Sequence, residues 1–378
     1  MDVDAPGGIL RYFADLKDPR MNRTKRHLLL DILTVAICGV ICGADGWVQI
    51  AKFGRCKRKW FKTFLDLPNG IPSHDTFGRV FALLDPAAFE ACFVRWINAL
   101  AESSAGRLIA IDGKTLRHSF NAAAGKAAIH MVSAWCQANR IVLGQVATDD
   151  KSNEITAIPE LLKRLDIKDA VVTIDAMGCQ KAIAAAIVDG GGDYLLQLKG
   201  NQTTLHAETE QLFQQCLTDD CQGVAYATAQ TIGKGHGRIE QRQLWATGEV
   251  GWFAERDRWK NLRSLIRVRA RRDVNGQVSI EDRYYITSLP SDDPARLLAL
   301  IRGHWEIENT LHWSLDINFR EDDSRIRTGH AAENYSRLNR LALNLLKRET
   351  SEKVGIKTKR LMAAWDHDFL LRILTQGI

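Results

Sequence analysis

The amino-acid sequence predicts an α/β fold that is preceded by a small all-α domain and followed by C-terminal helices. Up to residue 105, apolar residues recur at helical spacing, as between Leu28 and Ile41, without strand-like runs. From residue 106 onward, short apolar runs alternate with helical patterns in the order β-β-β-α-β-α-β. Such alternation is typical of a sheet with helices packed on it. Beyond residue 200 the pattern becomes β-rich, which indicates an insertion.

The pattern also predicts individual elements. Helices are expected over residues 28–44, 74–84 and 86–100, with Ser73 as the N-cap of the second. In the α/β part we expect strands 108–112, 129–136, 141–147, 171–175 and 194–198, and helices 154–165 and 179–188. The insertion contains a helix, 202–216, and strands 224–228, 241–246, 265–270, 278–280 and 283–287. Asp293 and Pro294 begin a long helix that reaches residue 315, and helices 333–347 and 361–374 follow.

Composition predicts a folded protein outside the membrane. Hydrophobic residues make up 46% and charged residues 25% of the 378 residues, which disfavours disorder. The N-terminus lacks the basic and apolar regions of a signal peptide, and the apolar run 28–44 is too short to span a membrane. The 8 cysteines include no C-x-x-C pair, so we expect reduced thiols in a cytoplasmic protein.

Three carboxylates are candidates for catalysis. Asp112 and Asp175 end the runs LIAID and VVTID, and ligands usually bind at the carboxyl ends of strands in an α/β sheet. Glu308 falls on the stripe of the long helix that contains Ile301 and Leu315, so we expect it in the packed face. An unpaired carboxylate is costly in such a position, which suggests a function for it.

The residue types narrow the chemistry of these carboxylates. Carboxylates that converge without cysteine ligands suit Mg²⁺ or Mn²⁺, and two such ions about 4 Å apart assist phosphoryl transfer. The sequence contains neither G-x-x-x-x-G-K-[ST] nor G-x-G-x-x-G, which disfavours NTPase and dinucleotide chemistry. Two alternatives remain open: each aspartate caps the loop that follows it, and Glu308 forms a buried salt bridge with Arg302 or His304.

Basic residues are clustered along the chain. Residues 52–62 and 260–272 hold six basic residues each and no acid, and residues 337–360 hold eight basic residues and two acids. A single cluster of this kind can be an ordinary solvated surface, but three in separate segments favour an extended polyanion. Arg267, Arg269 and Arg271 alternate onto one face of a predicted strand, as in a strand that follows DNA.

Six segments together resemble a known family: NGIPSHDTFGRVF (69–81), AIDGKTLRHS (110–119), TIDAMGCQ (173–180), YLLQLKGNQ (194–202), GHGRIEQR (235–242) and HWEIENTLHWSLDINFREDDSRIR (304–327). With the three carboxylates and the β-rich insertion, nearly the whole chain is similar to DDE transposases with a ribonuclease H-like catalytic core. The class it resembles most includes the H-repeat-associated transposases of bacterial Rhs elements.

The resemblance implies a bacterial enzyme, nucleoid-associated when bound to DNA, that cuts the ends of an insertion sequence and joins the freed 3′-hydroxyls to target DNA. It implies that Asp112, Asp175 and Glu308 bind two Mg²⁺ or Mn²⁺ ions, and that a homodimer holds terminal inverted repeats and target as double-stranded DNA. It also implies four domains along the chain. Residues 1–105 form an accessory domain that recognises DNA ends, and residues 106–200 form the first part of the core. Residues 201–292 form the insertion, and residues 293–378 complete the core. A ribonuclease H-like nuclease without strand transfer and a domesticated DNA-binding protein remain alternatives.

The charge clusters and the resemblance give a set of candidate DNA contacts: Lys57, Arg58, Lys59, Lys114, Lys199, His236, Arg238, Arg267, Arg269, Arg271 and His304. A related transposase group has the pattern Y-x2-R-x3-E-x6-K around its glutamate, where this chain has Ile301, His304 and Leu315. This departure leaves open whether DNA ends pass through hairpins. We expect His304 to replace the arginine as a partner for phosphate or carboxylate.

Overall fold

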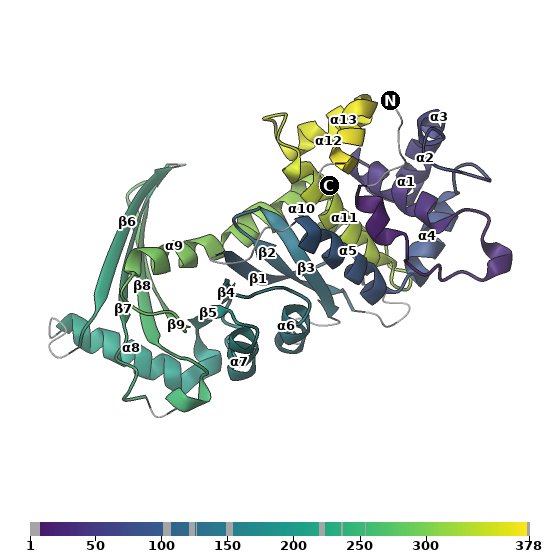
Figure 1. Cartoon of the computed structure of the whole chain (residues 1–378). Helices are drawn as coiled ribbons and strands as arrows, with labels where there is room; N and C mark the ends of the chain where they lie inside the picture. The colour runs from purple at the N-terminus through teal and green to yellow at the C-terminus, as the bar shows by residue number, and fades with distance from the viewer. Residues whose placement is uncertain are drawn as a thin grey trace.

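The computed structural model describes residues 8–100, 107–120, 125, 127–148, 154–218, 224–235, 237–253 and 255–375. Within these residues, nine strands form a single mixed sheet in the order β3-β2-β1-β4-β5-β9-β8-β7-β6. The N-terminal helices and α10 to α13 gather around the β3 end of the sheet, whereas α8 and α9 lie against β6 to β9 at the other end (Figure 1). The α/β class that the sequence predicts is therefore confirmed.

The N-terminal segment is helical, as predicted. Its helices are α1 (Leu29–Ile41), α2 (Trp47–Cys56), α3 (Arg58–Phe61), α4 (His74–Leu83) and α5 (Pro86–Leu100), preceded by short 3-10 turns at Ile9–Phe13 and Asn22–Thr24. Ser73 is the N-cap of α4, because its side chain accepts a hydrogen bond from the Thr76 backbone N–H. α1 is almost wholly buried because it packs between the other N-terminal helices and α11 (Ala331–Arg348).

The first part of the sheet follows the predicted order of elements. These are β1 (Leu108–Thr115), β2 (His130–Cys136), β3 (Ile141–Thr148), α6 (Glu154–Leu162), β4 (Val171–Ile174), α7 (Lys181–Asp189) and β5 (Asp193–Leu198). β1 pairs with β2 in antiparallel and with β4 in parallel orientation, and β4 pairs in parallel with β5. The buried strands are nearly continuous apolar runs because helices cover both of their faces.

The β-rich segment continues the same sheet. After a 3-10 turn, Gly200–Gln202, it contains α8 (Thr203–Thr218), β6 (Ala227–Gly235), β7 (Arg238–Thr247), a second turn, Arg256–Arg258, β8 (Ser264–Val274) and β9 (Gln277–Thr287). β9 pairs with β5 through residues 284–287 and 195–198. We call β6 to β9 the arm. The two predicted strands 278–280 and 283–287 are one strand, β9. The sequence did not show this, because the outer arm is solvent-exposed and lacks the regular apolar alternation that marks a continuous strand.

The C-terminal segment differs from the prediction in two places. It contains α9 (Pro294–His304), a π-helical segment (Ile307–His312), α10 (Trp313–Phe319), a 3-10 turn (Glu321–Asp323), α11, α12 (Ile356–Trp365) and α13 (His367–Thr375). The long helix predicted up to residue 315 is thus interrupted. The predicted helix 361–374 is two helices, because the Asp366 side chain accepts hydrogen bonds from the backbone N–H groups of Asp368 and Phe369 and so begins α13. None of the described helices is long and apolar enough to cross a membrane.

A buried ion pair joins the N-terminal helices, the sheet and α11. Glu90 of α5 accepts hydrogen bonds from Arg337 Nε at 2.7 Å and from the backbone N–H of Gln145 in β3 at 2.7 Å. The side chains of Glu90 and Arg337 are 0% and 3% exposed. Glu333, which is more exposed, accepts a second hydrogen bond from Arg337 at 2.8 Å. Segments that are far apart in the sequence therefore meet at one charged contact.

We expect Glu90→Gln to lower the free energy of unfolding by about 3–5 kcal/mol, because it leaves the buried Arg337 guanidinium without its most buried counter-charge. Urea denaturation measures the change. Glu333→Gln is the matched control on the same guanidinium, and its cost should be clearly smaller because Glu333 is partly solvated. Equal losses in the two variants would contradict this explanation.

Candidate functional site

The two aspartates directly follow the last residue pair of the parallel β1–β4 ladder. Asp175 comes after the end of β4, but Asp112 does not end its strand as predicted, because β1 continues to Thr115 beside β2. Ile111 of β1 is the partner of Ile174 in β4 in the parallel ladder, so Asp112 and Asp175 are the next residues on adjacent strands. Both side chains are partly buried. The two carboxylates lie in the same region, since they occupy adjacent positions of the two strands and Asp175 acts electrostatically on Asp112.

The alternative interpretation, that each aspartate caps the loop after it, holds for Asp175 but not for Asp112, whose hydrogen bond is to the next residue of the same strand. Asp112 Oδ1 accepts a hydrogen bond from the Gly113 N–H at 2.9 Å, and Asp175 Oδ1 accepts one from the Met177 N–H at 3.0 Å. These bonds use one oxygen of each carboxylate. Asp112 Oδ2 lies 3.6 Å from His312 Nδ1, too far for a hydrogen bond. Local capping and a shared site are therefore compatible.

The surroundings of Asp112 are strongly acidic. The pKa of Asp112 is raised to about 7, mainly by burial. The nearby carboxylates of Asp175, Glu154 and Glu308 contribute to this rise, and the hydrogen bond from Gly113 opposes it. Burial, with Arg340 and Lys114 nearby, lowers the pKa of His312 to about 3. His312 is thus neutral at pH 7 and supplies no counter-charge. In the described part of the chain, no lysine or arginine forms an ion pair with Asp112, whose only charged neighbours are carboxylates.

Glu154 is a fourth carboxylate that the sequence did not single out. It begins α6, is 4% exposed, and its Oε1 lies 2.5 Å from His130 Nε2 on β2. His130 Nδ1 in turn lies 2.9 Å from Thr115 Oγ1. A Cβ at position 113 would collide with both the His130 imidazole and the Glu154 carboxylate, so only glycine fits at this position, directly after Asp112. In the sequence Glu154 is merely an acid at a helix start, and only the tertiary structure brings it to Asp112.

Glu308 does not lie in the packed face, so that prediction is wrong. It is exposed, whereas its neighbour Ile307 and Leu311 are buried. The helix is not continuous here: α9 ends at His304 and the π-helical segment begins at Ile307, so the stripe is interrupted. Of its members, Ile301, His312 and Leu315 are buried, whereas Trp305 and Glu308 are exposed. The alternative of a buried salt bridge at Glu308 fails for the same reason.

The π-helical segment connects two differently packed helices. α9 buries Leu297, Leu298 and Ile301 in a cluster with the arm strands β7 to β9, whereas Leu311 and Leu315 belong to the main core. Each helix must therefore present its apolar side to a different partner, and the extra residue in the π turn makes the rotation between them possible. Glu308 lies at this junction.

The three predicted carboxylates are close enough to interact electrostatically but do not form a closed ligand set. Glu308 and Asp175 both act on the pKa of Asp112. Among the described residues, however, no three His, Cys, Asp or Glu side chains are grouped closely enough to hold a metal ion. Hydrogen bonds from the backbone hold the carboxylates of Asp112 and Asp175 in place. The Glu308 side chain is exposed, so it is the carboxylate of the three that can change its orientation.

Two predicted DNA contacts, Lys114 and Arg267, are buried. Lys114 forms ion pairs with Asp316 at 2.8 Å and Asp322 at 2.7 Å, which fix β1 against α10 and the following turn. Arg267 is 1% exposed and bonds to Asp282 at 2.8 Å. Neither is the free surface cation that the sequence predicted, since carboxylates distant in the sequence neutralise both.

His304 is also unsuited to its predicted role as a cation. Its Nδ1 lies 3.1 Å from Thr173 Oγ1 on β4, and burial lowers the pKa of His304 to about 4. The side chain is therefore neutral at pH 7. It contributes to the packing of α9 on β4 and cannot replace an arginine as a charged phosphate partner.

The other predicted contacts lie in three places. The helical N-terminal segment at α2–α3 carries Arg58, Lys59 and the partly buried Lys57, and Lys199 is exposed after β5. The arm carries Arg238, Arg269 and Arg271. Two of these form ion pairs, Arg269 with Asp282 and Arg238 with Glu240. His236 lies outside the described residues. The structure therefore does not gather these residues into one site.

A groove of about 440 Å³ runs from the arm to Glu308. Its lining residues come from β7, β8, β9, α9 and the π-helical segment: Arg238, Glu240, Arg242, Val268, Ala270, Arg283, Tyr285, Ile301, Arg302, Trp305, Glu308 and Asn309. Four of them are arginines and two are glutamates, so positive charge predominates. The Arg283 guanidinium lies over the Trp305 ring, 4.9 Å from its centroid. Of the predicted contacts, Arg238 belongs to this groove.

Comparison with known proteins identifies the family. Residues 103–345 match the family described as Transposase DDE domain, and residues 10–97 match the one described as DDE_Tnp_1-associated. The chain belongs to the DDE-domain transposase family. The resemblance seen in the sequence is therefore confirmed.

Relatives in bacteria cover most of the chain. "Putative transposase YncI" of Escherichia coli O157:H7 is 42% identical over 370 residues, 97% of this chain and 94% of that protein. "H repeat-associated putative transposase YhhI" of Escherichia coli K12 is 40% identical over 372 residues, 97% of each. "Uncharacterized protein in dhlA 3'region" of Xanthobacter autotrophicus is 46% identical over 284 residues, 74% of this chain and 94% of that protein.

The acidic surroundings of Asp112 predict a pH-dependent stability. The folded chain keeps the Asp112 proton up to about pH 7, whereas the unfolded chain releases it near the ordinary value of 3.8. Since the folded state binds more protons in this range, the group costs increasing stability as pH rises from about 4 to 7.

We expect Asp112→Asn, which keeps the hydrogen bond to Gly113 but removes the charge, to raise the Tm at pH 8 in metal-free buffer and to change it little at pH 4. Differential scanning calorimetry at both pH values measures this. Asp189→Asn, on the exposed end of α7, is the control and should show no such gain. An unchanged or lowered Tm for Asp112→Asn at pH 8 would rule out carboxylate crowding.

Proposed function

We propose that this chain is a metal-dependent DNA transposase that cuts the ends of an insertion sequence and joins the 3′-hydroxyl ends to target DNA. The observation that carries the proposal is the pair Asp112 and Asp175 at adjacent positions of β1 and β4, within electrostatic reach of Glu308, which lines an arginine-rich groove. The sheet order β3-β2-β1-β4-β5, with β2 antiparallel, supports a ribonuclease H-like core. The family to which the chain belongs supports DNA as the substrate.

The donor set suits Mg²⁺ or Mn²⁺. The residues that would hold the ions are Asp112, Asp175 and Glu308, all oxygen donors. The pKa of Asp112 is raised by burial and, to a lesser extent, by the neighbouring carboxylates, and a hard cation would stabilise its charged form. When bound, two such ions activate the attacking oxygen and stabilise the leaving oxygen in phosphoryl transfer. Glu308 is exposed, so its side chain can turn towards the aspartates without breaking core packing.

The remaining residues position the reactants. Lys114, bonded to Asp316 and Asp322, fixes β1 against α10, so that Asp112 keeps its position relative to the π-helical segment. The buried Glu154 limits the space behind Asp112 and adds negative charge. Arginines of the groove neutralise phosphates of a strand that reaches Glu308. Catalysis in this scheme consists of positioning and charge neutralisation.

The other parts of the chain have proposed roles in the DNA complex. Residues 1–105, with the exposed Arg58 and Lys59, would recognise the terminal repeats. Two ends must be held together for insertion, which favours a homodimer on DNA. The four-part division of the chain stays a prediction, and the continuous sheet joins the arm directly to the core.

Strand transfer of terminal inverted-repeat DNA in the presence of Mg²⁺ tests the proposed activity. We expect Asp112→Ala, Asp175→Ala and Glu308→Ala each to lower the rate by at least about 100-fold, because each removes a ligand that acts on the transition state. Asp189→Ala, far from the groove, should keep full activity. Cut ends that are never joined would indicate a nuclease instead, and specific binding without cleavage would indicate a DNA-binding protein.

Arg302 tests the groove separately from the chemistry. It is exposed on α9 and lines the groove, whereas Arg296 is exposed on the same helix outside it. We expect Arg302→Glu to weaken DNA binding and to reduce the slope of log K against log salt by about one, as for the loss of one phosphate contact. Arg296→Glu should have a much smaller effect. Equal effects in fluorescence-anisotropy titrations would show that only net charge matters.

A further inference from the structure

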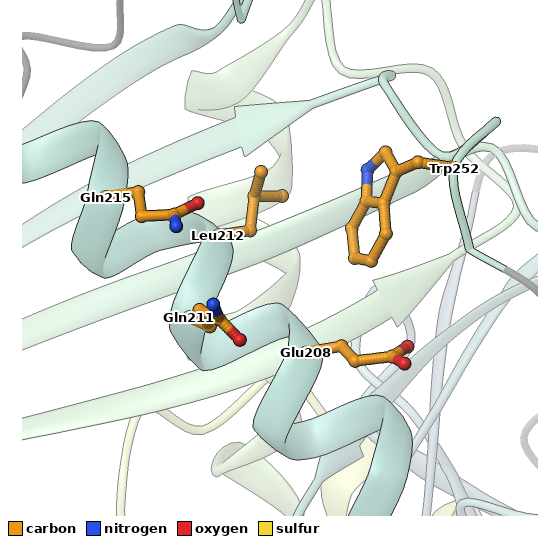
Figure 2. Close-up of a pocket in the computed structure, with 5 residues that line it drawn as sticks. All are labelled: Glu208, Gln211, Leu212, Gln215 and Trp252. Atoms are coloured by element: carbon orange, nitrogen blue, oxygen red, sulfur yellow. The ribbon is translucent and has the colours of Figure 1, made fainter.

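A pocket of about 350 Å³ lies between α8 and the loop that follows β7. One wall of the pocket is a side of α8 that carries Glu208, Gln211, Leu212 and Gln215 (Figure 2). The Trp252 ring faces this wall from the loop. α8 packs on the face of the arm that carries Tyr284, whereas the groove at Glu308 is lined by Tyr285. Successive residues of a strand point to opposite faces. The pocket is therefore on the other side of the sheet from the groove.

The walls of the pocket are held in place. Phe213 of α8 is buried and stacks on Tyr284 of β9, with 6.4 Å between ring centroids. The Trp252 side chain is 45% exposed, but its Nε1 donates a hydrogen bond to the Glu249 carbonyl at 2.5 Å. This bond fixes the orientation of the indole while leaving much of its surface accessible. A ligand would thus meet a preformed aromatic surface.

One polar atom in the pocket has no partner. Glu208 Oε2 is buried, and among the described residues it makes no hydrogen bond. A buried carboxylate oxygen without a partner is costly, because it has lost its hydration and gained nothing in return. The pocket also presents the side-chain amide of Gln211, one turn along α8 from Glu208, and that of Gln215 at the other end of the pocket (Figure 2). A cationic donor would satisfy the carboxylate, and the amide oxygens could accept further hydrogen bonds.

We infer that this pocket binds the guanidinium group of an arginine side chain from another polypeptide. A guanidinium is planar and stacks on an indole, and it carries five N–H donors for a carboxylate and nearby amide oxygens. A lysine ammonium offers three donors and no planar face. Leu212 completes the pocket with an apolar surface for the methylene groups of the arginine. The inference does not depend on the proposed transposase activity, since the pocket lies on the opposite face of the sheet.

Nuclear magnetic resonance of the full chain with ¹⁵N-labelled tryptophan tests this inference. Trp252→Phe identifies the Trp252 indole signal, and Nα-acetyl-arginine amide is the probe. We expect a saturable shift of that signal with a millimolar Kd, as suits one isolated side chain. Nα-acetyl-citrulline amide, which has nearly the same shape but no charge, should bind at least about 10-fold more weakly, because the charge-assisted bond to Glu208 is lost.

Two variants on the same helix separate the carboxylate from general charge. Glu208→Gln should abolish the shift, whereas Glu210→Gln, a neighbouring acid that does not line the pocket, should preserve it. Unchanged signals from the other indoles will show that each variant is folded, and Glu208→Asp provides a second test that retains the charge but shortens its reach.

Several results would overturn the inference. These are no shift with the arginine probe up to about 100 mM, equal binding of the citrulline probe, equal or tighter binding of Nα-acetyl-lysine amide or spermidine, and equal loss in Glu208→Gln and Glu210→Gln. Preference for the lysine probe or spermidine would indicate a site for ammonium groups.

Discussion

β1 and β4 are hydrogen-bonded in parallel from the Leu108–Val171 pair to the Ile111–Ile174 pair, and the next residue on each strand is an aspartate. This pairing places two carboxylates side by side at the edge of a buried sheet, where water is scarce and like charges repel. Glu154 and Glu308 add to the same field, as the raised pKa of Asp112 reflects. The strand pairing thus creates an electrostatic strain that the site retains because its backbone is fixed by the rest of the sheet.

Much of this arrangement follows from local sequence. The apolar runs that end in Asp112 and Asp175 predict their strands, and Ser73 predicts the start of α4. These features depend on periodicity and on side chains that bond to the adjacent backbone, which a single sequence displays directly. Asp366 carried the same kind of signal, but the apolar spacing around it concealed the break between α12 and α13.

Other features depend on contacts between distant segments and could not be predicted in this way. Whether Glu308 is buried is decided by the different clusters that α9 and α10 pack against, and the local pattern alone continues the helix unbroken. Arg267 and Lys114 look like free cations until the strands and turns that carry Asp282 and Asp322 are placed beside them. Glu154 comes close to Asp112 only when α6 is folded against the sheet.

The continuous sheet has a mechanical consequence. β9 is hydrogen-bonded to β5 through residues 284–287 and 195–198, and β5 lies next to β4. A force on the tip of the arm is therefore transmitted as shear through backbone hydrogen bonds to the strand that ends at Asp175. A duplex lying along the arm and reaching the aspartates would contact one continuous hydrogen-bonded sheet. Bending a short DNA site to follow such a surface costs about 1–6 kcal/mol and depends on its sequence.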